Sequence, residues 1–140
     1  MSRSGYSDDC DGWALIRWRG AVKSAIKGKR GQAFLREVLA TLDAMPVKSL
    51  AAHSLQDQAS GEFCTLGAVG AARSLDMKPL EDADREDIAK AFGISEALAA
   101  EIMFENDEDF VWRSRDEHSG EARWNRMRAW IESQIERATP

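Results

Sequence analysis

The chain has only two cysteines and two histidines in 140 residues, and it has no long run of apolar residues. Cys10 and Cys64 stand far apart without a CxxC or CxxH neighbour, so we expect free thiols, with Cys64 packed, rather than a disulfide. No stretch approaches the roughly 18 apolar residues of a membrane-spanning helix. The polar N-terminus also lacks the apolar segment of a signal peptide. The sequence therefore predicts a cytoplasmic protein with no membrane partner.

Motifs that would identify an enzyme or a metal protein are also missing. His53 and His118 lie far apart, and neither has a neighbour at a spacing that zinc sites use. Residues 106–109, Asn-Asp-Glu-Asp, offer oxygen atoms without the Asp-x-Asp-x-Asp-Gly order of a calcium loop. There is no GxxxxGK[ST], no GxGxxG after a clear strand, and no histidine placed beside a nucleophile. The sequence predicts a protein that is not an enzyme and that uses no metal and no cofactor.

The composition, with 44% hydrophobic and 31% charged residues, is typical of a soluble globular protein. Apolar residues at helical spacing predict helices over residues 12–27, 32–45, 67–75, 119–137 and two within 83–107. Residues 47–66 are interpreted as one small β-hairpin around a polar turn. The expected fold is mainly α, a compact multi-helix single domain over residues 12–140, preceded by a flexible N-terminus at 1–11.

Glycines at two places in the sequence lead to specific predictions about how neighbouring segments pack. The break at residues 28–31 lies between two amphipathic helices and predicts an antiparallel helical hairpin. In the next expected helix, Gly67 and Gly70 would let a neighbouring segment approach closely.

Residues 83–107 have the spacing of a helix-turn-helix. The positions that give this spacing are Ala89, Gly93, Ile94 and Ile102. The second helix would carry Glu96, Glu101 and Glu105 and no Lys or Arg. Because cations that neutralise phosphates supply most of the affinity for DNA, we expect this helix-turn-helix-like pair to serve packing.

Charge is distributed unevenly along the chain, whose net charge is −5. Residues 12–36 contain no acid, and their bases are Arg17, Arg19, Lys23, Lys27, Lys29, Arg30 and Arg36. Residues 76–109 hold twelve acids against three bases. Either the two regions complement each other across the folded surface, or at least one of them meets a charged partner.

The basic turn at residues 28–31 is a candidate anion or nucleic-acid site. Lys27, Lys29 and Arg30 supply charge just before a long helix, whose free N–H groups and dipole favour an anion. An acidic protein is the other partner that suits these cations, and a solvated turn without a specific role is the remaining alternative.

Three segments carry a family resemblance: GKRGQAFLREVLATLDAMP, CTLGAVGAARSLDM and RWNRMRAWIESQIE. They resemble a family of short proteins encoded by bacteriophages and prophages, over most of the chain from Trp18 onward. The resemblance implies a viral accessory protein that acts inside a bacterial cell, and it brings no catalytic residues. Small acidic phage proteins of this kind often bind host machinery, including defence complexes.

The leading hypothesis is a non-enzymatic phage-derived binding protein, an inhibitor of a host defence complex in the manner of an anti-CRISPR protein. Its acidic surface would engage a basic surface on a host protein or complex. The residues assigned to this surface are Glu96, Glu101, Glu105, Asp107, Glu108 and Asp109. The alternatives are a nucleic-acid-binding or regulatory protein that uses residues 17–36, and a structural virion or assembly component. The sequence makes no prediction of the oligomeric state.

Overall fold

The structure, a computed structural model, describes residues 3–4, 12–107 and 119–136, the side chains of residues 12–15 excepted. Its elements are α1 (Gly12–Lys27), α2 (Lys29–Ala44), α3 (Thr65–Ala72), the 3-10 helix η1 (Lys78–Leu80), α4 (Arg85–Phe92), α5 (Glu96–Asp107) and α6 (Gly120–Gln134). Across these described ranges the chain forms no β-sheet, so the prediction of a mainly α-helical single domain is confirmed.

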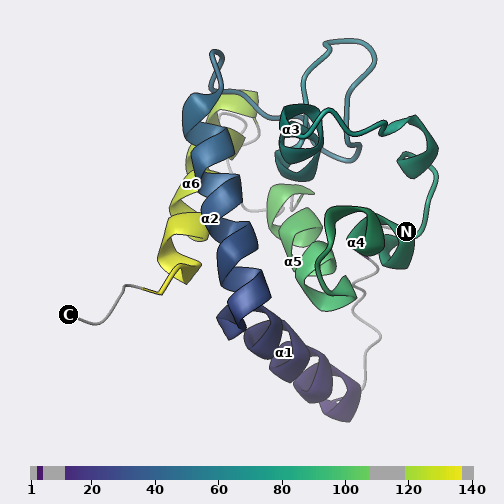
Figure 1. The fold of residues 1–140 in the computed structure, drawn as a ribbon, viewed down its shortest axis with the longest axis vertical. Coiled ribbons are helices and arrows are strands. Elements are labelled where there is room, and N and C mark those ends of the chain that lie inside the picture. Colours follow the sequence, from purple (N-terminus) through teal and green to yellow (C-terminus); the bar gives the residue numbers. More distant parts are fainter. Residues whose placement is uncertain (1–2, 5–11, 108–118, 137–140) are drawn as a thin grey trace.

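The core lies where α2, α5 and α6 come together. Helix α2 packs against α6 on one side and α3 on the other, while α5 contacts α1, α3, α4 and α6 (Figure 1). The fully buried side chains of these three helices include Leu35, Val38, Leu42, Leu98, Ile102, Met103, Met127 and Ile131. Because α5 is covered by four other helices, nearly its whole circumference is buried.

The connection between α1 and α2 differs from the expected antiparallel hairpin. Only Gly28 leaves the helical conformation, with φ −64° and ψ 157°, and α2 begins at Lys29. Figure 1 shows α2 continuing onward from α1 rather than folding back beside it. The predicted break in the helix is present but is confined to Gly28. The predicted antiparallel hairpin is wrong, because a single residue is shorter than the two to five that an antiparallel helix pair needs.

Residues 47–64 form an irregular loop in place of the β-hairpin expected over 47–66, and residues 65–66 already belong to α3. A single isolated antiparallel bridge joins Gln56 to Phe63. The amide of Leu55 donates to the Glu81 carboxylate at 2.7 Å, so a side chain occupies a donor that a longer strand ladder would use. The loop is thus held by side chains from elsewhere in the fold as well as by its own backbone.

Helix α3 begins two residues earlier than expected because Cys64 caps it. The Cys64 sulfur accepts a hydrogen bond from the amide of Gly67 at 3.3 Å, and Cys64 is buried as expected. Close approach at Gly67 and Gly70 is confirmed: a Cβ at Gly67 would overlap the carbonyl oxygen of Leu55, and one at Gly70 would press on the Met77 side chain.

The helix pair within residues 83–107 forms as predicted. Asp84 caps α4 through the amide of Asp87 at 2.9 Å, and Ser95 caps the start of α5 through the amide of Leu98 at 3.1 Å. Gly93 ends α4 in the left-handed conformation, with φ 73°. This pair packs together in the fold.

The last helix, α6, is capped by Ser119, which accepts from the amide of Ala122. The sequence predicts a buried stripe of Trp124, Met127, Ile131 and Ile135, and the first three are buried in α6. Ile135 lies just past the end of the helix and is half-buried. The expected apolar anchor at residues 110–112 lies outside the described residues. Across the described ranges, the helices are all too short or too polar to cross a membrane.

Candidate functional site

Two of the acids assigned to a partner-binding surface lie in the interior. Glu101 is 2% exposed, and its carboxylate lies 2.6 Å from Nη1 of Arg19. Asp107 is 8% exposed and pairs with Arg3. Both acids therefore hold parts of the chain together instead of facing a partner.

The other two acids of that set that the structure describes are half-buried. Glu96 pairs with Arg85 at 2.6 Å, and the guanidinium of Arg85 also lies 4.7 Å from the ring centre of Trp18. Glu105 is half-buried, and Glu108 and Asp109 lie outside the described residues. The physical reason is the central position of α5, whose small residues Ala97, Ala99 and Ala100 let neighbours close on every side. That run of alanines is the signal in the sequence that could have indicated burial.

Arg3 is an interior residue that sequence reasoning did not find. Its Nε and Nη2 donate to the two carboxylate oxygens of Asp107 at 2.5 and 2.7 Å. Asp107 also accepts from the amide of His53 and the side-chain amide of Asn106. Burial by itself would raise the pKa of Asp107, but the hydrogen bonds and charge of Arg3, with the two further donors, outweigh it and lower that pKa.

The N-terminal residues are tied into the fold at two points. Besides Arg3, Ser4 is 2% exposed, and its carbonyl oxygen accepts from Nη1 of Arg85 at 2.6 Å. The expected flexible N-terminus covers residues 1–11, and at these two positions the chain is packed. These contacts join α4 and the end of α5 to the chain that precedes α1.

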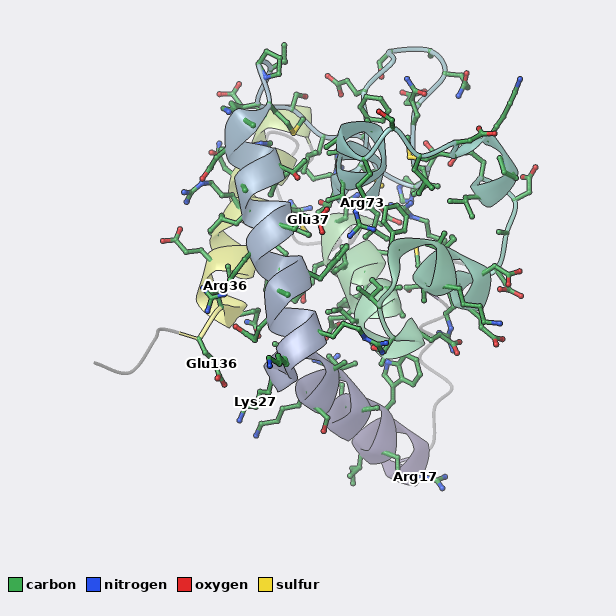
Figure 2. All side chains as sticks on the ribbon, viewed as in Figure 1. Arg17, Lys27, Arg36, Glu37, Arg73 and Glu136 are labelled. Carbon is green, nitrogen blue, oxygen red and sulfur yellow. The ribbon has the colours of Figure 1, made fainter. Side chains whose placement is uncertain are left out.

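The basic region, in contrast, remains on the surface. Arg19 pairs with Glu101, and Arg36 donates to the backbone oxygen of Glu136 at 2.8 Å (Figure 2). The remaining cations are exposed and have no ion pair or hydrogen bond with any described residue; they are Arg17, Lys23, Lys27, Lys29 and Arg30. We call these five residues the basic face.

The basic face follows α1 and turns the corner at Gly28. In Figure 2, Arg17 lies toward the outer end of α1 and Lys27 lies near the corner, and both side chains point away from the body of the molecule. Lys29 and Arg30 are the first two residues of α2 and border a hollow of about 230 Å³. Of the three predicted anion-site residues, Lys29 and Arg30 thus border one hollow, and Lys27 lies on the other side of Gly28.

A second hollow, of about 460 Å³, lies between α1 and the end of α6. Lys23 and Lys27 line it together with the apolar side chains of Val22, Ile26 and Ile135. The basic face therefore has a concave border on each side of the corner.

Comparison with protein-family models, curated proteins and solved structures finds no match. A function must be inferred from the side chains themselves. Among the described residues, no three His, Cys, Asp or Glu side chains gather as they would around a metal ion. The exposed basic face is the feature that remains to be explained.

Proposed function

We propose that this protein is a non-enzymatic binding protein that holds nucleic acid by its phosphates through the basic face. The observation that supports the proposal is that five of the seven cations between Arg17 and Arg36 are exposed and without a described partner. A set of cations kept out of internal ion pairs, in a chain of net charge −5, suits a polyanionic ligand.

The physical basis is the release of counterions. Each phosphate that a Lys or Arg neutralises releases condensed cations, so affinity falls steeply as the salt concentration rises. If all five cations of the basic face contact phosphates, the slope of log K against log salt is about −4.5. Between 50 and 200 mM salt this slope corresponds to a loss of affinity of about 500-fold.

The structure favours this alternative over the leading hypothesis of an acidic binding surface. Glu96, Glu101 and Asp107 are already neutralised by arginines from other parts of the chain. A partner that bound these acids would have to break those pairs first, and two of the acids, Glu101 and Asp107, are buried.

A pair of double variants tests the proposal by titrating fluorescent nucleic acid at several salt concentrations. We expect Lys27→Gln with Lys29→Gln to weaken binding and to reduce the salt slope by about 2, since each phosphate contact contributes about 1. Lys78→Gln with Lys90→Gln removes the same charge from exposed positions outside the basic face. An equal loss of binding in both variants would show a response to net charge alone and would reject the proposed interface.

The host context is part of the proposal. The resemblance to bacteriophage and prophage proteins implies action inside a bacterial cell, where a protein that holds nucleic acid would inhibit a defence complex by competing for its nucleic acid. A virion component is the competing interpretation. Detection of the protein in purified particles would favour that interpretation.

A further inference from the structure

Helix α1 presents a free outer face over most of its length. Val22 and Ile26 are 1% and 8% exposed and pack on the fold, together with the half-buried Trp18. Figure 1 shows the outer end of α1 extending beyond the other helices. The side of α1 opposite Val22 is therefore open to a partner.

Over residues 16–27 of α1, whose side chains the structure describes, the centre of this outer face carries small residues. At 100° per residue, Gly20 and Ser24 lie opposite Val22 on the helix. Both are exposed, and a Cβ at Gly20 would meet no atom within 4 Å. On the same projection, Arg17 lies to one side of this centre, and Lys23 and Lys27 lie to the other.

A helix with small residues at its centre and cations on both flanks fits the major groove of B-form DNA. The groove is about 12 Å wide, and a helix with its side chains is about 10–12 Å across, so bulk on the leading face decides how deeply it can enter. The flanking cations would then reach the phosphates of the two strands. A-form RNA offers a deep, narrow major groove that does not admit a helix in this way.

We propose that α1 lies in the major groove of B-form DNA, with Gly20 and Ser24 toward the base edges and the flanking cations on the phosphates. Lys29 and Arg30, beyond the corner at Gly28, extend the phosphate contacts along the backbone. This inference rests on the proposed function and narrows its ligand to duplex DNA.

The test compares Gly20→Leu with Ala40→Leu, an equally bulky change at an exposed position of α2. Binding is measured by fluorescence anisotropy with one sequence as DNA duplex, RNA duplex and single-stranded DNA. We expect Gly20→Leu to weaken binding to DNA duplex by about tenfold or more with its salt slope nearly unchanged, and Ala40→Leu to bind as the parent does. A small molecule that fills the minor groove of the same DNA duplex should not displace the protein, because α1 would occupy the major groove.

Circular dichroism of both variants checks that the helices remain folded. Equal affinity of Gly20→Leu and the parent for DNA duplex would overturn the groove assignment, and so would RNA duplex or single-stranded DNA that binds as tightly as DNA duplex. If either result occurs while the double variant Lys27→Gln with Lys29→Gln still weakens binding, α1 does not lie in the major groove, but the proposed binding of nucleic acid through the basic face stands. If that double variant also binds normally, the proposed function fails as well.

Discussion

Arg3 shows how much of this fold depends on single charged residues in the interior. Its guanidinium makes two hydrogen bonds to Asp107, which also receives the amide of His53. A third donor group of Arg3, Nη1, lies 3.6 Å from the sulfur of Cys64, the capping residue of α3. One side chain near the start of the chain therefore links the end of α5 to the beginning of α3.

Removing this charge should destabilise the protein in a pH-dependent way. We expect Arg3→Gln to lower the free energy of unfolding at pH 7 by about 3 kcal/mol, because Asp107 is left buried and without its counter-ion. The folded pKa of Asp107 is lowered, so the stability that the pair contributes is present above the unfolded pKa, about 4, and is lost as the pH falls through the folded value. Urea unfolding at pH 7 and pH 3 should show the gap between parent and variant closing at the lower pH.

The exposed pair between Lys90 and Glu86 provides the contrast for that experiment. Its nitrogen–oxygen distance is 3.5 Å and both side chains are largely exposed. Lys90→Gln should leave the free energy of unfolding nearly unchanged at either pH. A gap between Arg3→Gln and its parent that stays constant with pH would contradict the assigned role of Asp107.

At the scale of elements, the helices and the turn at Gly93 were predictable, but the α1–α2 connection and the loop over residues 47–64 were not. The apolar stripe of α6 and the caps Asp84 and Ser95 follow from local spacing, which the sequence displays directly. The corner between α1 and α2 depends instead on Gly31, which lies against the carbonyl of Ala25. That contact depends on how the two helices meet, so no local pattern in the sequence predicts it.

The candidate site was likewise predictable only where it depends on local sequence. Lys27, Lys29 and Arg30 were found from their sequence alone, because charge and a helix start are local properties. The burial of Glu101 and its pair with Arg19 depend on where α5 packs, which charge counting does not show. The acids of α5 were therefore assigned to the surface, although two of them, Glu101 and Asp107, are buried.

Glycine substitutions in the first two helices test this difference between local and packed positions. Gly31→Ala should lower the free energy of unfolding by about 2–3 kcal/mol, since the new Cβ would overlap the carbonyl oxygen of Ala25. Gly20→Ala should raise it by about 0.5–1 kcal/mol, because the position is open and alanine favours the helix. Thermal and urea unfolding of the two variants measure both effects. Equal effects of the two substitutions would mean that α1 and α2 do not meet as closely as the structure shows.

For the molecule as a whole, the two charged regions of the sequence pair with each other only in part. The half-exposed Arg19 joins them through its ion pair with the buried Glu101. Outside this pair, exposed acids gather around η1 and α4, and they are Asp76, Glu81, Asp82, Asp84, Glu86 and Asp87. The folded protein thus keeps both an acidic region and the basic face, and the acidic region repels any polyanion that approaches.

Neutralising part of the acidic region should therefore strengthen binding to DNA rather than weaken it. Asp82→Asn, Glu86→Gln and Asp87→Asn together move the net charge from −5 to −2, because three carboxylates are lost. At about 10 mM salt, where the screening length is about 30 Å, we expect a gain in affinity of about twofold to fivefold over the parent. At about 150 mM salt, where that length is about 8 Å, the two proteins should bind almost equally. Anisotropy titrations at both salt concentrations measure the change. A loss of affinity would instead mean that the acids of α4 contact the ligand, and the basic face would then not be the interface.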